Sequence, residues 1–185
     1  MLTPPQLHAH SKARAGLTLV ELMMVMVVLT VAVSMLAGSM SSAARLGPVQ
    51  RENALAGEGA RRMLETLRGQ PFMDIYALYN ADPSDDPGGA GTAPGSGFAI
   101  QGLEPLADDA DGLPGEILFP TQTPPLFENG TWLELGLPRD LDLDGVIDAT
   151  DHSDDYQILP IEVRIRWRGV NGARSLSLYT QFVEV

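Results

Sequence analysis

An uncharged, apolar run near the N-terminus constrains this chain more than any other feature. Residues 22–44 contain no charged side chain, and they open with Leu-Met-Met-Val-Met-Val-Val-Leu. About 20 such residues in a helix cross the ~30 Å hydrocarbon core of a bilayer. The run is apolar on every side rather than along one stripe, which is unlike the surface helix of a soluble domain. The sequence therefore predicts that residues 17–44 form a membrane-spanning helix.

This run has three other interpretations: a cleaved secretory signal, a simple membrane anchor and a buried core helix. A secretory signal has an apolar region of about 7–15 residues followed by a small-residue cleavage site, and this run is longer. A simple anchor does not explain Glu21, a carboxylate at the edge of the run, where an ionisable group is costly and by default functional. Lys12 and Arg14 precede the run, so we expect a cytoplasmic N-terminus and an exported remainder.

Composition excludes several classes of function. The 185 residues fit one ordinary domain with an appendage, and a formal charge of -12 argues against nucleic acid as the main partner. The chain has no cysteine, which excludes disulfides, thiol catalysis and zinc–cysteine sites. A Ser-His-Asp triad would have to use His152, around which nothing resembles a nucleophile turn. We therefore expect neither an enzyme nor an organic cofactor.

Residues 15–22, Ala-Gly-Leu-Thr-Leu-Val-Glu-Leu, follow a basic leader and precede the apolar run. This arrangement resembles the type IV prepilin (class III) signal, in which a prepilin peptidase cuts after the glycine on the cytoplasmic side and methylates the new N-terminus. The resemblance implies a leader peptide of residues 1–16, cleavage between Gly16 and Leu17, and N-methylation of Leu17. The family has Phe more often than Leu after the glycine, so Leu17 is a departure from its pattern.

The same resemblance implies a role for Glu21 in assembly. In the family, the glutamate of an incoming subunit meets the N-terminal amine of a subunit already in the filament. An unpaired charge at membrane depth costs several kcal/mol, so this pairing is favourable. The partners implied are the prepilin peptidase, other pilin or pseudopilin subunits, the inner-membrane assembly platform and the membrane itself. The chain would first be a single-pass inner-membrane protein with a periplasmic head.

The function that the resemblance implies is a structural subunit, of the minor kind, in a type IV pilus or a type II secretion pseudopilus. The residues leave open whether the filament is a pilus, a secretion pseudopilus or a DNA-uptake filament. The alternative is a membrane-anchored exported binding module or enzyme whose apolar helix is only a tether. Cleavage by a prepilin peptidase after Gly16 distinguishes the two functions, because only the pilin-like subunit requires it.

The expected fold class is α+β, with one long N-terminal helix packed on a small antiparallel sheet. Residues 45–185 are the expected head, beginning with an amphipathic half-helix over residues 45–69 that ends near Gly69, because Pro71 follows. Aromatic and apolar side chains after Pro71 share one helical face, which predicts a short helix capping the core. These side chains are Phe72, Ile75, Tyr76 and Tyr79.

Residues 80–155 form a loop-rich acidic region, in which the apolar runs 98–103, 116–119 and 131–135 are candidate strands. Residues 156–185 predict a hairpin, because apolar and polar side chains alternate on both sides of Asn171-Gly172, a pair typical of a type I′ turn. Pairing around that turn puts Trp167 opposite Leu176, Ile165 opposite Leu178 and Ile161 opposite Phe182, with all six on one face.

A twelve-residue stretch just before the hairpin has the spacing of a calcium loop. Asp140, Asp142, Asp144, Val146, Asp148 and Asp151 occupy the ligand positions of an EF-hand loop, with Gly145 at the sharp turn. Asp151 stands where that loop usually has Glu, and flanking helices are not expected beside Pro138. The alternative is a solvated acidic loop. Some pseudopilins hold a calcium ion in the head, so the resemblance also favours calcium as a cofactor.

Overall fold

The computed structural model describes residues 18–184, apart from the side chains of residues 42–45. These residues divide into two compact units, one ending at Leu46 and the other beginning at Gly47. Helix α1, Leu19–Arg68, contributes to both units. The second unit holds four antiparallel strands in the order β1-β2-β3-β4. This is the predicted α+β, pilin-like layout of one long N-terminal helix and a small antiparallel sheet.

Both ends of α1 follow local sequence signals. Thr18 precedes the helix, and its hydroxyl accepts the Glu21 backbone N–H at 3.2 Å, which satisfies one of the N–H groups that a helix start leaves unpaired. At the other end, the Gly69 N–H donates to the carbonyl of Glu65 at 3.2 Å, just after the last helical residue. The predicted end of the helix near Gly69 is therefore confirmed.

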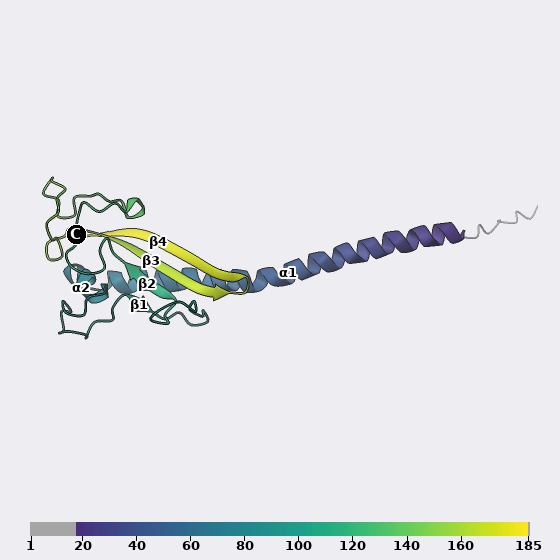
Figure 1. Cartoon of the computed structure of the whole chain (residues 1–185), viewed down its shortest axis with the longest axis horizontal. Helices are drawn as coiled ribbons and strands as arrows, with labels where there is room; N and C mark the ends of the chain where they lie inside the picture. Colours follow the sequence, from purple (N-terminus) through teal and green to yellow (C-terminus); the bar gives the residue numbers. More distant parts are fainter. Residues whose placement is uncertain (1–17, 185) are drawn as a thin grey trace, which may run out of the picture. The chain divides into compact units, whose positions relative to one another are not determined.

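The sheet covers the part of α1 that belongs to the second unit (Figure 1). Ala56, Ala60 and Leu67 of α1 are completely buried, at spacings of four and seven residues that keep them on one face of the helix. The sheet contributes Ile161, Val163 and further side chains of β3 to the same apolar cluster. Each fully buried valine, leucine or isoleucine side chain in this cluster stabilises the fold by about 1.5–3 kcal/mol.

The aromatic segment after Pro71 caps this core, as predicted. It forms a 3-10 helix η1, Phe72–Asp74, followed by the short helix α2, Ile75–Tyr79. Ile75, Tyr76 and Tyr79 are buried in the apolar cluster, and Phe72 packs against it. The Tyr156 hydroxyl donates to the Phe72 carbonyl at 2.8 Å, which joins the segment to the chain just before the C-terminal hairpin.

The C-terminal hairpin consists of β3, Ile158–Gly169, and β4, Gly172–Val183. Its register differs by two residues from the predicted one: Ile165 pairs with Leu176, Val163 with Leu178 and Leu159 with Phe182. The predicted pairs of Trp167 with Leu176, Ile165 with Leu178 and Ile161 with Phe182 are therefore wrong.

The turn explains the shift. A type I′ turn needs positive φ at both central residues. Gly172 has φ 109°, but Leu143 is the only non-glycine residue with positive φ in the described part of the chain, so Asn171 does not take the predicted conformation. The loop is then Val170-Asn171, with Gly172 as the first residue of β4. A shift of two residues preserves the side-chain alternation, so the apolar side chains still share the core face.

The middle of the chain contains less strand than predicted. Run 98–103 gives only β1, Gly97–Phe98, and run 116–119 corresponds to β2, Gly115–Leu118. Run 131–135 is not a strand but holds the 3-10 helix η2, Leu133–Leu135. In a strand the two leucines would share one face, whereas a 3-10 helix rotates them apart. Leu133 is accordingly 78% exposed and Leu135 2% exposed.

Candidate functional site

The first half of the predicted calcium loop brings its carboxylates together. Carboxylate oxygens of Asp140, Asp142 and Asp144 lie within 4.8 Å of one another. The Asp140 carboxylate also accepts the Gly145 N–H at 2.8 Å, and Asp142 accepts the Asp144 N–H at 3.0 Å. Gly145 has φ 92°, the left-handed conformation that the sharp turn of such a loop requires of a glycine. Three of the six predicted ligands therefore surround one turn.

The second half of the loop is arranged differently. Asp148 accepts both the N–H and the hydroxyl of Thr150 at 2.7 Å, and these two bonds hold the pKa of Asp148 below its ordinary value. The Asp151 carboxylate accepts the Leu126 N–H at 2.9 Å and also the hydroxyl of Ser153. Burial raises the pKa of Asp151, but these hydrogen bonds outweigh it and leave the pKa lowered. Neither side chain joins the three-aspartate cluster.

Val146, the predicted carbonyl ligand, lies beside that cluster in the chain. Its N–H donates to the Asp144 carboxylate at 2.7 Å, and its side chain is exposed. The pKa of Asp142, in the middle of the cluster, is raised above its ordinary value. The Asp144 N–H lowers that pKa, but partial desolvation and the negative charge of Asp144 together outweigh the hydrogen bond. A cation between these carboxylates would relieve their mutual repulsion.

Glu128 is a carboxylate that the sequence pattern did not single out. It is completely buried, and one of its oxygens accepts the N–H groups of Leu141 and Asp142, the latter at 3.4 Å. Its other oxygen accepts the Asp148 N–H at 3.1 Å. Glu128 therefore contacts the backbone of both halves of the predicted loop, from a segment that precedes the loop in the sequence.

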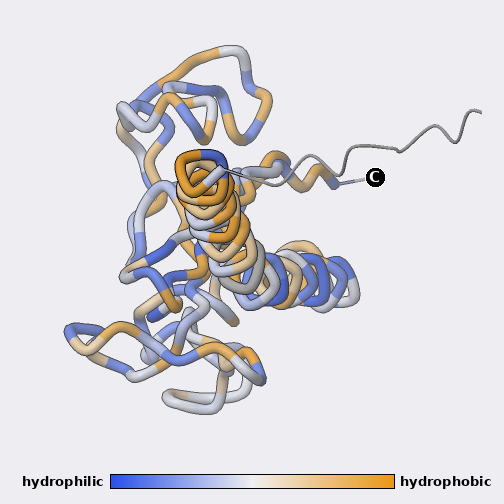
Figure 2. Tube along the Cα trace, turned by 90° about the vertical axis from the view of Figure 1, so that its right-hand side faces the viewer, coloured by the Kyte–Doolittle hydropathy of each residue, from blue (hydrophilic) through white to orange (hydrophobic). Residues whose placement is uncertain are grey.

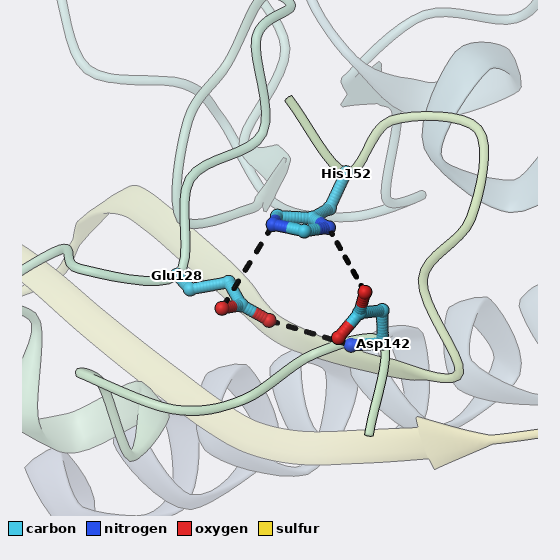
Figure 3. A group of neighbouring side chains, drawn as sticks. All are labelled: Glu128, Asp142 and His152. Carbon is cyan, nitrogen blue, oxygen red and sulfur yellow. Dashed lines mark hydrogen bonds and ion pairs between the residues drawn. The ribbon is translucent and has the colours of Figure 1, made fainter. Parts of the chain in front are cut away.

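His152 lies between two of these carboxylates (Figure 3). Its Nε2 is 3.8 Å from a Glu128 oxygen and its Nδ1 is 3.7 Å from an Asp142 oxygen. A metal ion would take one ring nitrogen, whereas carboxylates on opposite nitrogens suit an imidazolium, which donates from both. Desolvation lowers the pKa of His152, but the hydrogen bond to Asp148 and the charge of Glu128 outweigh it and raise the pKa.

The other candidate site lies at the start of the chain, where α1 is apolar and unburied. Of the helices that the structure describes, α1 is the one long and apolar enough to cross a membrane. Its large apolar side chains from Leu19 to Met40 are exposed, and Figure 2 shows predominantly hydrophobic colouring around its first turns. A continuous apolar helix surface of this length is unfavourable in water, so we expect lipid or other apolar helices to surround it.

Glu21 lies in the first turn of α1 and is exposed. Within residues 18–184, no side chain or backbone group is found to pair with its carboxylate. The predicted cleavage site, Gly16 and Leu17, lies outside the described residues. A carboxylate at the edge of an apolar, membrane-length helix therefore has no partner within the described part of its own chain.

A comparison with known families identifies this segment. The model described as "Prokaryotic N-terminal methylation motif" matches residues 11–37. The chain carries a type IV pilin-like signal. The match includes Gly16, Leu17 and Glu21, together with the apolar first part of α1. No curated protein and no solved structure gives a significant match to the chain.

The pilin-like signal explains why the apolar run is followed by more helix rather than by a signal-peptide cleavage site. It points to a membrane-anchored structural subunit rather than to an enzyme, and it implies processing by a prepilin peptidase and assembly with other pilin subunits in general terms. The signal covers a small part of the chain, so the acidic loop and the hairpin lie outside the matched residues.

Proposed function

We propose that this chain is a minor structural subunit of a type IV pilus or a type II secretion pseudopilus. The observation that carries the proposal is the methylation motif over residues 11–37, which places Glu21 at the start of an exposed apolar helix. A simple tether needs no carboxylate there. The basic residues Lys12 and Arg14 support a cytoplasmic N-terminus and a periplasmic head.

The mechanism of assembly follows from charge at membrane depth. Cleavage after Gly16 would free the amine of Leu17, one helical turn before Glu21. Either charge alone is costly in hydrocarbon, and pairing with the opposite charge of a neighbouring subunit removes that cost. The pairing sets the axial register of one helix against the next. Small residues in the apolar run allow the helices to approach closely: Ala32, Ser34, Ala37, Gly38 and Ser39.

Substitution of Glu21 tests this role. We expect Glu21→Gln and Glu21→Ala to leave cleavage intact but to lower recovery in sheared filaments at least tenfold, because the free amine then has no carboxylate partner. Glu58→Gln is the matched control, because Glu58 is an exposed glutamate of the same helix that pairs with Arg62 on the helix surface. Recovery of the Glu21 variants equal to that of Glu58→Gln would contradict the proposal and favour the tether.

We also propose that the head binds calcium through Asp140, Asp142 and Asp144. Calcium takes 6 to 8 oxygen ligands, and three carboxylates within 4.8 Å around a glycine turn fit the first half of such a site. The Val146 carbonyl and water would supply further oxygens. Asp148 and Asp151, which accept hydrogen bonds from Thr150 and Leu126, would have to exchange these partners in order to bind the ion. In a chain without cysteine, the ion would fix the loop that precedes the hairpin.

Thermal unfolding of the full-length chain in detergent tests the calcium proposal. A ligand at about 100 times its Kd stabilises the folded state by about 2.7 kcal/mol, so calcium should raise the Tm of the wild type. Asp140→Ala with Asp144→Ala should abolish the rise. Asp108→Ala with Glu134→Ala removes two exposed carboxylates outside the loop and should preserve it. A titration that shows no binding at millimolar calcium would rule the site out.

A further inference from the structure

The buried carboxylate of Glu128 connects the two halves of the aspartate loop. Leu141, Asp142 and Asp148 donate their backbone N–H groups to it, and they occupy positions 2, 3 and 9 of the twelve-residue loop. Glu128 is 0% exposed, whereas the loop residues Asp144 and Val146 are exposed. The loop is therefore held from its buried side by one carboxylate that lies outside it.

The backbone around Glu128 is fixed by the same loop. The Arg139 N–H donates to the Glu128 carbonyl at 3.0 Å, and the His152 N–H donates to the Leu126 carbonyl at 3.0 Å. Asp151, the expected closing ligand, accepts the Leu126 N–H instead. The backbone of residues 126–128 thus hydrogen-bonds to the residues at both ends of the loop. In an EF-hand loop the closing carboxylate comes from position 12 of the loop itself.

We propose that Glu128 is the positioning residue of the calcium loop: it holds the two halves of the loop, its arms, at the spacing at which the carboxylates of Asp140, Asp142 and Asp144 converge. This inference rests on the proposed calcium binding. Hydrogen bonds to an ionised acceptor are about twice as strong as neutral ones, and a fully buried carboxylate depends on them for its stability. On this proposal the bonds to Glu128 order the arms before calcium binds, so that little binding free energy is spent on ordering them.

If Glu128 positions the loop, the calcium affinity should depend on Glu128 although its carboxylate is not a ligand of the ion. Removal of a residue that orients metal ligands commonly lowers metal affinity about 10- to 100-fold. Glu128→Gln keeps the size of the side chain but replaces one acceptor oxygen with an NH2 group that faces backbone donors. Glu128→Asp keeps the charge but is one methylene shorter, so it reaches only one arm.

Isothermal titration of calcium chloride into the full-length chain in detergent tests the proposal. We expect Glu128→Gln to raise the Kd at least tenfold, Glu128→Asp to raise it by a smaller factor, and the exposed Glu134→Gln to leave it unchanged. A purely structural Glu128 would lower the Tm without calcium and leave the Kd of the folded protein unchanged. A Kd within twofold of the wild type would therefore overturn the positioning role while the calcium proposal stands. No binding by the wild type would overturn both.

A measurement on the unmutated protein covers the case in which these variants do not fold. Amide hydrogen exchange without calcium should be slow at Leu141, Asp142 and Asp148, because their N–H groups are already bonded to Glu128. Protection that arises only after calcium is added would show that the ion, and not Glu128, orders the arms. That outcome would overturn the positioning role.

Discussion

The indole N–H of Trp167 donates to the carboxylate of Glu52 across 3.4 Å, although the two residues are 115 positions apart in the sequence. The other Glu52 oxygen accepts the Val170 N–H at 3.1 Å. One side chain of α1 therefore holds both the last buried aromatic residue of β3 and the turn that follows it. Trp167 is 1% exposed, so water cannot easily replace the carboxylate as an acceptor.

Glu52→Ala should lower the free energy of unfolding of the head by about 1–3 kcal/mol, because it leaves the buried indole N–H unpaired. Glu65→Ala is the matched control, since Glu65 is an exposed glutamate of the same helix that pairs with Arg68, and such surface pairs contribute about 0–1 kcal/mol. Denaturant titration followed by Trp fluorescence measures both variants. Equal effects would show that the Glu52–Trp167 contact is not a stabilising one.

Two glycines of α1 should respond differently to substitution by alanine. A Cβ at Gly57 would meet nothing within 4 Å, so Gly57→Ala should stabilise the helix by up to about 1 kcal/mol. A Cβ at Gly59 would lie 2.8 Å from Cδ1 and 3.2 Å from Cγ2 of Ile100. Overpacking of this kind costs about 1–3 kcal/mol, so Gly59→Ala should be neutral or destabilising. Thermal unfolding that shows equal gains for both variants would contradict the close packing of Ile100 on α1.

A pH series should separate two aspartates in the loop after α2. Burial raises the pKa of Asp85, against a hydrogen bond from Asn80, and its Oδ1 is the buried side-chain atom that lacks a partner in the described part of the chain. The hydroxyl and N–H of Ser84 lower the pKa of Asp82. A raised folded-state pKa means that stability is lost as pH rises through it, whereas a lowered one means that stability is lost as pH falls.

Asp85→Asn should therefore have a higher Tm than the wild type at about pH 7, and the difference should shrink towards about pH 3, where the unfolded-state carboxyl is protonated. Asp82→Asn should show the opposite sign, with a lower Tm than the wild type near neutral pH and a difference that shrinks as pH falls towards the lowered pKa of Asp82. Scanning calorimetry of both variants across this range makes the comparison. A difference that stays constant with pH would show that ionisation of these side chains is not its cause.

The faces of the C-terminal hairpin could be predicted from sequence, whereas its register could not. Alternation of apolar and charged residues decides which side chains are buried, and Ile161, Val163 and Ile165 are all fully buried. Register depends on which residues of the turn take positive φ. Asn-Gly is compatible with more than one turn geometry, because the glycine alone can supply that conformation.

The candidate calcium loop was only partly predictable, for two physical reasons. Spacing identified Asp140, Asp142 and Asp144 correctly as neighbours, since alternate residues of a tight turn converge. The remaining aspartates are each followed two positions later by a hydroxyl residue, Thr150 or Ser153, and this local hydrogen bonding competes with ligation. Glu128 left no signal in the sequence, because only the tertiary fold brings it to the loop.

The mature N-terminus is the measurement that tests the central claim most directly. If the chain is processed through its pilin-like signal, intact-mass analysis and N-terminal sequencing of membrane-extracted protein will find a chain that begins at Leu17 with a methylated amine. In a strain without prepilin peptidase, the same protein should retain residues 1–16. An uncut chain that begins near Met1 in the presence of the peptidase, or a chain cut beyond residue 35, would contradict the assignment.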